Sequence, residues 1–172
     1  ISLKEVIPDL LEEPRVLFQR AGAVVKRERE RLFICMKDRP DPLKISTGPY
    51  PGFPTDMQSL FMAFLSIAKG ESCITENVFE DRFGTAAELV KMGADITCQG
   101  KTAVIKGVPL LAGTKVRALD LRGAAALVMA ALGAEGSTII EDCYHIKRGY
   151  EDICRDLRAL GGRADWMESD TG

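Results

Sequence analysis

The sequence has little of what several common functional classes require. It contains one histidine, His145, and five cysteines without any Cys-x-x-Cys pair. The odd cysteine count and this spacing argue against a disulfide framework and against a zinc site, and they fit a reducing compartment. Catalysis by a Ser-His or Cys-His pair would depend on His145 alone, and no neighbouring pattern supports it.

Strong charge and long apolar runs are missing as well. The net charge of −2 gives no electrostatic case for nucleic acid or for an anionic membrane as partner. The longest apolar run, 123–134, is too short to span a bilayer. The N-terminus carries acidic residues where a signal peptide would be basic and then apolar, and no initiator Met is present. We expect a cytoplasmic globular protein whose upstream residues are missing.

A helix end followed by a strand occurs three times. The segments "AGAVV", "MGADI" and "LGGRA" begin at residues 21, 92 and 160, and each places glycine where a helix would stop. A second alignment has an offset of 66 residues, and it superimposes these pairs: Gly70 and Gly136, Arg82 and Arg148, Asp56 and Arg122. This spacing is too long for a solenoid repeat and indicates a larger module used more than once.

The pattern predicts an α/β (α+β) fold built from strand-helix-strand-helix-strand-strand modules, with about two and a half modules in one domain. We expect a partial module over 1–40 and further modules over 41–110 and 111–172. The middle module should contain these elements: strand 44–47, helix 55–68, strand 72–77, helix 84–92 and strands 94–98 and 102–106. The last should contain strand 114–119, helix 121–133, strand 137–142 and helix 149–160, and the first should contain strands 23–27 and 31–36 around a solvated "KRERER" hairpin.

A rigid segment, "GPYPGFPTDMQ" over 48–58, delivers Asp56 to the first turn of a hydrophobic helix. Thr55 and Gln58 have the spacing of a capping box, in which each side chain satisfies a backbone N–H. Asp56 would then be a first-turn anion that the helix dipole favours. Alternatively Asp56 is a general base, and this segment alone does not decide between the two.

Three arginines stand near predicted helix starts. Asp120 is a good N-cap, but Arg122 lies in the first turn, where the dipole disfavours a cation. Arg82 and Arg148 occupy the same repeat position. Arginine binds carboxylate or phosphate through paired donors, so one carboxylate among several arginines predicts a polyanionic small substrate and one base. This pattern implies neither a metal nor a redox cofactor. For Arg122 the alternative is a structural ion pair with Asp120.

Five strings in the chain resemble a known family. "PYPGFPTDMQ", "TENVFEDRF", "MGADI", "ALDLRGAAALVMAAL" and "YHIKRGYEDICRDLRALG" are similar to the second half of UDP-N-acetylglucosamine 1-carboxyvinyltransferase, a bacterial enolpyruvyl transferase that opens peptidoglycan synthesis. The resemblance covers essentially the whole chain. It implies a fold of two domains, each of three such modules, with the active site in the cleft between them.

The resemblance also implies a role for each candidate residue. Asp56 would be the base for the sugar 3-hydroxyl, and Val78 would contact UDP-N-acetylglucosamine through its backbone. Arg122 and Arg148 would hold the carboxylate and phosphate of phosphoenolpyruvate, with Asp120 orienting Arg122. The remaining candidate, at the position before "FGTAAELV", is Arg82, which would lie near the substrate or hold the cleft loops.

The same resemblance implies that a partner is missing. In this family the N-terminal domain carries the loop with a reactive Cys or Asp and the substrate-binding Lys and Arg. This chain alone should therefore not catalyse the reaction. Two alternatives stay open. One is another enolpyruvyl transferase, such as 5-enolpyruvylshikimate 3-phosphate synthase, and the other is a catalytically dead relative that serves as a binding or regulatory module.

Overall fold

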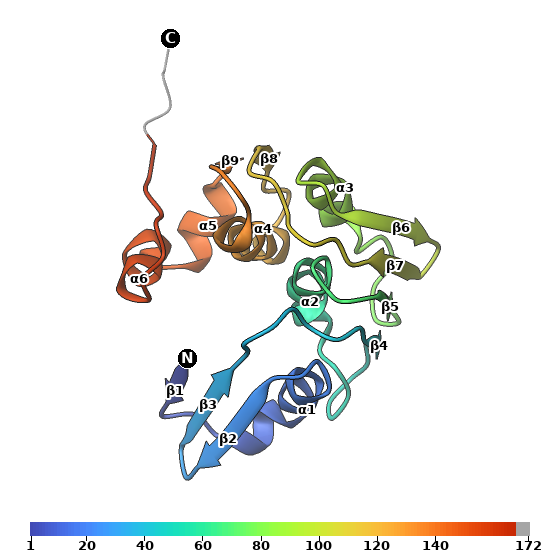
Figure 1. The fold of residues 1–172 in the computed structure, drawn as a ribbon, viewed down its shortest axis with the longest axis vertical. Coiled ribbons are helices and arrows are strands. Elements are labelled where there is room, and N and C mark those ends of the chain that lie inside the picture. Colours follow the sequence, from blue (N-terminus) through green and yellow to red (C-terminus); the bar gives the residue numbers. More distant parts are fainter. Residues whose placement is uncertain (168–172) are drawn as a thin grey trace.

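The middle of the chain forms one complete module with the predicted order of elements. The computed structural model describes residues 1–167 (Figure 1). Within it, the middle module consists of β4 (Lys44–Ser46), the 3-10 helix η2 (Thr55–Met57), α2 (Gln58–Leu65), β5 (Glu71–Thr75), α3 (Gly84–Lys91), β6 (Asp95–Gln99) and β7 (Thr102–Lys106). The strands form a sheet in the order β4-β5-β7-β6. β4 and β5 are parallel because α2 carries the chain back between them, whereas β5, β7 and β6 pair antiparallel.

The last module repeats the first half of this arrangement. β8 (Lys115–Arg117) pairs in parallel with β9 (Ile139–Glu141), and α4 (Leu121–Gly133) connects them. The predicted single helix over 149–160 is wrong, because α5 (Tyr144–Gly149) ends there and α6 starts anew at Ile153–Ala159. Asp152 starts α6 by accepting a hydrogen bond from the Arg155 N–H at 3.0 Å. The expected strand after this helix is also wrong for 162–167, which are irregular.

The first module is a three-stranded antiparallel sheet with one helix. It contains β1 (Ser2–Lys4), the 3-10 helix η1 (Pro8–Leu11), α1 (Glu12–Arg20), β2 (Val24–Glu28) and β3 (Arg31–Cys35), and the strand order is β1-β3-β2. The predicted hairpin around the charged run is confirmed, since β2 and β3 pair directly. β1 was not predicted, and it pairs along one edge of β3.

Glycine ends the helices for the predicted reason. Gly22, Gly93 and Gly161 follow α1, α3 and α6 with φ of 96°, 91° and 90°. Side chains rarely adopt this left-handed conformation, whereas glycine reaches it without steric cost. The three helix-ending glycines found by sequence spacing are therefore equivalent in structure.

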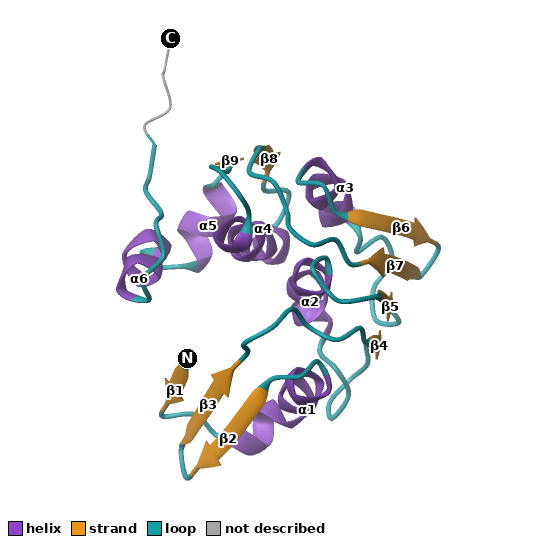
Figure 2. Ribbon diagram, viewed as in Figure 1, coloured by secondary structure: helices purple, strands orange, loops and turns teal. Residues whose placement is uncertain are grey.

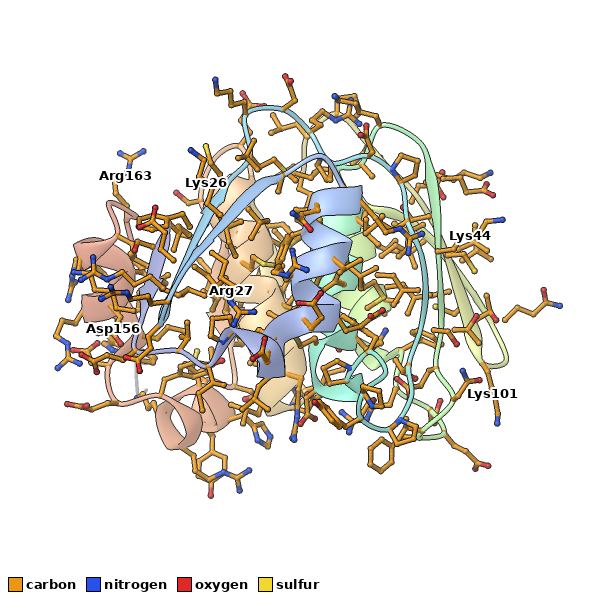
Figure 3. All side chains as sticks on the ribbon, turned by 90° about the horizontal axis from the view of Figure 1, so that it is seen from below. Lys26, Arg27, Lys44, Lys101, Asp156 and Arg163 are labelled. Atoms are coloured by element: carbon orange, nitrogen blue, oxygen red, sulfur yellow. The ribbon has the colours of Figure 1, made fainter. Side chains whose placement is uncertain are left out.

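The core lies between the helices and the sheets that surround them (Figures 1 and 2). α2 and α4 pack against each other, and α1 joins α2 through an aromatic cluster. In that cluster the Phe18 ring lies 5.1 Å from Phe61 and 5.5 Å from Phe64, measured between centroids. Alanines at buried positions of α4, such as Ala126 and Ala130, allow close helix contact. Figure 3 shows charged side chains such as Lys26 and Lys101 extending away from this core.

Candidate functional site

The proline-rich approach to α2 is anchored in the core just before Asp56. Phe53 is buried, and its ring packs edge-on against Phe61 with centroids 5.0 Å apart. Residues 48–53 form a closed loop, because the Gly48 N–H donates a hydrogen bond to the Phe53 carbonyl at 3.0 Å. Asp56 follows in η2 with its side chain 61% exposed. Rigid anchoring of its neighbours thus holds an exposed carboxylate at the start of α2.

The predicted capping box is wrong. Neither η2 nor α2 has a side-chain cap. The Thr55 hydroxyl donates to Glu76 Oε2 at 2.8 Å, and Gln58 is fully buried, with its amide oxygen accepting a hydrogen bond from Ser59. The spacing suggested a local pair, but the Thr55 hydroxyl bonds to Glu76, which follows β5, and the Gln58 side chain is buried in the core.

Asp56 and Arg122, which the 66-residue offset aligns in sequence, are in contact in the structure. Arg122 Nε donates to Asp56 Oδ1 at 2.9 Å, which joins the starts of α2 and α4 across 66 residues of sequence. Both side chains are accessible, at 61% for Asp56 and 41% for Arg122. Such an exposed pair contributes about 0–1 kcal/mol to stability, so a ligand can displace it at small cost.

Asp120 positions Arg122 through the backbone. Its carboxylate accepts hydrogen bonds from the backbone N–H groups of Arg122 at 2.8 Å and of Gly123 at 2.9 Å. The predicted N-cap of α4 is therefore confirmed. The alternative for Arg122, a structural ion pair with Asp120, is not formed, because the Arg122 guanidinium bonds to Asp56 instead.

Arg82 and Arg148 do not occupy the same structural position, contrary to the prediction. Arg82 lies in the loop before α3, with its guanidinium 4.5 Å from the centre of the Phe79 ring. Arg148 lies in the last turn of α5, 5.7 Å from the centre of the Tyr144 ring. Within residues 1–167 neither arginine forms a salt bridge, and neither joins the Asp56–Arg122 pair.

Glu76 is a buried carboxylate that the sequence analysis missed. It follows β5, is 1% exposed, and accepts hydrogen bonds from Val78 N at 2.8 Å and Phe79 N at 3.1 Å. Burial raises the pKa of Glu76, but the hydrogen bonds from the Val78 N–H, Thr47, Thr55 and the Phe79 N–H outweigh it, so the pKa lies below its ordinary value. The available signal was an acid directly after a buried strand.

Val78 lies beside the same carboxylate. The residue is 42% exposed, and its N–H already donates a hydrogen bond to Glu76. Its carbonyl oxygen is therefore the backbone group left for a ligand.

A small apolar cavity of about 90 Å³ lies between α2 and α4, and none of the candidate residues lines it. In the described part of the chain, no three His, Cys, Asp or Glu side chains gather as metal ligands do. None of the helices over 1–167 has the length and apolar character needed to cross a bilayer.

Known proteins resemble this chain over most of its length. The family described as EPSP synthase (3-phosphoshikimate 1-carboxyvinyltransferase) matches residues 3–157. A UDP-N-acetylglucosamine 1-carboxyvinyltransferase of Aeromonas hydrophila is 45% identical over 96% of this chain and 40% of its own length. One of Desulfofundulus thermocisternus is 48% identical over 95% of this chain and 67% of its own length. The chain thus spans about two fifths of the first of these relatives.

Solved structures agree in fold. The enolpyruvyl transferase NikO from Streptomyces tendae has a TM-score of 0.79 and 31% identity, covering 88% of this chain and 35% of its own. EPSP synthase from Acinetobacter baumannii has a TM-score of 0.57 at 20% identity, covering 73% of this chain and 30% of its own, which supports the fold alone. The fold is that of the enolpyruvyl transferases, and the chain belongs to the EPSP synthase (3-phosphoshikimate 1-carboxyvinyltransferase) family, among relatives named UDP-N-acetylglucosamine 1-carboxyvinyltransferase.

Proposed function

We propose that this chain is part of an enzyme that transfers the enolpyruvyl group of phosphoenolpyruvate to the 3-hydroxyl of UDP-N-acetylglucosamine, the first committed step of peptidoglycan synthesis. The observation that carries the proposal is the contact between Asp56 and Arg122 at the starts of two helices. It sets a potential base beside a cation that suits an anionic substrate. The identity of 45–48% to relatives with that activity in their names supports the choice of acceptor.

Arg122 has donors to spare for phosphoenolpyruvate. A guanidinium carries five N–H groups, and only the one on Nε is used by Asp56 among residues 1–167. The four others can bind a carboxylate or phosphate in a paired geometry. Arg148 supplies the second cation in this proposal, and Arg82 lies near the substrate or holds the cleft loops. Asp120 sets the backbone position of Arg122.

The reaction proceeds by addition and elimination. Asp56 takes the proton of the sugar hydroxyl, whose oxygen attacks C2 of phosphoenolpyruvate while C3 gains a proton. The tetrahedral intermediate then loses phosphate, and C3 gives up a proton to restore the double bond. Fixed guanidinium groups stabilise the charge that develops on the leaving phosphate. The Val78 carbonyl contacts the sugar nucleotide.

We also propose that the enzyme is completed by an N-terminal domain and works in the bacterial cytoplasm, where it serves cell-wall synthesis and thus cell shape and division. The share of the relatives' length that this chain leaves uncovered supports the missing domain. The five cysteines, free and in part exposed at Cys35 and Cys98, fit a reducing compartment. No metal or organic cofactor enters this mechanism.

A comparison of two acceptors tests the proposal. The complete gene product that carries this chain is assayed for phosphate release from phosphoenolpyruvate with UDP-N-acetylglucosamine or with shikimate 3-phosphate. Release with the sugar nucleotide alone is expected. Release with shikimate 3-phosphate alone would assign the chain to the other activity of the family, and release with neither would indicate a catalytically dead relative.

A further inference from the structure

Glu76 is a buried anion without a cationic partner. It is 1% exposed, and no Lys or Arg within residues 1–167 forms a salt bridge with it. Its charge is instead met by hydrogen bonds: Oε1 accepts from Thr47 Oγ1 at 2.8 Å, from Val78 N at 2.8 Å and from Phe79 N at 3.1 Å, and Oε2 accepts from Thr55 Oγ1 at 2.8 Å. Burying a charge is costly unless such bonds satisfy it. All four donors are thereby fixed relative to one carboxylate.

These donors come from three segments that the proposed reaction needs together. Thr47 follows β4, Thr55 precedes Asp56 in η2, and Val78 and Phe79 lie in the loop after β5. We propose that Glu76 is a positioning residue for the transfer, holding the Asp56 turn and the Val78 loop at a fixed separation. This inference rests on the proposed function, because it assigns Asp56 and Val78 their roles from that function.

The two carboxylate oxygens of Glu76 bind different segments. Oε1 accepts hydrogen bonds from Thr47 and from the loop of Val78 and Phe79, whereas Oε2 accepts only from Thr55, in the turn that carries Asp56. Removing the Thr55 hydroxyl therefore frees the base-bearing turn while the three bonds to Oε1 remain. A shift of the base alone lowers the rate of the chemical step and leaves binding of the sugar nucleotide nearly intact.

Thr55→Val in the complete gene product tests this division, with Thr55→Ser as the rescue variant. Ser72→Ala is the matched control: its hydroxyl is also buried, at 1% exposure for the residue, and accepts from Leu43 N at 3.1 Å at the opposite end of β5. The measurements are kcat, KM for UDP-N-acetylglucosamine and the melting temperature.

The expected result is a reduced kcat with a nearly unchanged KM for UDP-N-acetylglucosamine. Thr55→Val lowers kcat by about tenfold to a hundredfold, with KM for the sugar nucleotide changed less than about twofold, and Thr55→Ser restores kcat. Ser72→Ala lowers the melting temperature with normal kcat. Normal kcat in Thr55→Val despite a lowered melting temperature would overturn the inference and leave the proposed function standing. No transfer by the unmodified protein would overturn both.

Discussion

Replacing Asp56 by Asn keeps the size of the side chain and removes the proposed base. If Asp56 takes the hydroxyl proton, kcat falls by about a hundredfold to ten-thousandfold. That loss corresponds to roughly 3–5 kcal/mol in activation free energy. A first-turn anion without a chemical role would give no such loss.

The structure predicts a much smaller effect of the same change on stability. Asp56 caps neither η2 nor α2, so no backbone N–H loses its partner. Its pair with Arg122 is exposed on both sides, at 61% and 41%, and an exposed pair contributes about 0.2–1 kcal/mol. The free energy of unfolding should therefore change by no more than about 1 kcal/mol.

Steady-state phosphate release and urea unfolding of the complete gene product measure the two effects. Asp9→Asn is the matched control, because Asp9 also pairs with an arginine, Arg27 at 2.6 Å, with side chains 73% and 49% exposed, in a part of the first module away from the candidate residues. Asp9→Asn should leave kcat unchanged. A variant Asp56→Asn with near-normal kcat and clearly reduced stability would refute the assignment.

Four further outcomes follow from the structure. Arg148→Lys should reduce kcat/KM for phosphoenolpyruvate more than Arg82→Lys, because lysine keeps the charge but lacks the paired donors; equal small losses would count against the assignment. Gly107→Ala should lower the free energy of unfolding by about 1–3 kcal/mol in denaturant titrations, since a Cβ there would lie 2.0 Å from the Ala68 carbonyl oxygen. Because the pKa of Glu76 is lowered in the folded protein, its ionised carboxylate stabilises the fold at pH values above its ordinary pKa of 4.5, and this stabilisation is lost as pH falls through the folded-state pKa. Below about pH 4.5, the unfolding free energy of Glu76→Gln should therefore depend less on pH than that of the unmodified protein. The isolated chain should fold, judged by a cooperative melting transition, yet release no phosphate from the two substrates.

Local signals predicted the fold well where a single segment determines its own structure. α4 begins and ends at the predicted residues because Asp120 caps it and an alanine-rich stretch follows. The helix-ending glycines, including Gly93, were found because only backbone conformation was at stake. The 66-residue offset aligns Asp56 with Arg122 in sequence, but that alignment did not predict the contact between their side chains that the structure shows.

Tertiary contacts explain what the sequence analysis did not find. Thr55 matches a capping box, but its hydroxyl bonds to Glu76, which lies 21 residues away. The position of Glu76 directly after a buried strand was its one local signal, and its role could not be predicted because its hydrogen-bond donors come from segments that meet only in the folded chain. Arg148 was expected before a helix, but a helix boundary at Asp152 splits the segment and leaves Arg148 in the last turn of α5.

The most direct measurement is the mass of the acceptor after incubation of the complete gene product with phosphoenolpyruvate and UDP-N-acetylglucosamine. The proposed function predicts an acceptor heavier by one enolpyruvyl group, with one phosphate released for each acceptor converted, and loss of this product in Asp56→Asn. An acceptor of unchanged mass, or full conversion by Asp56→Asn, would contradict it.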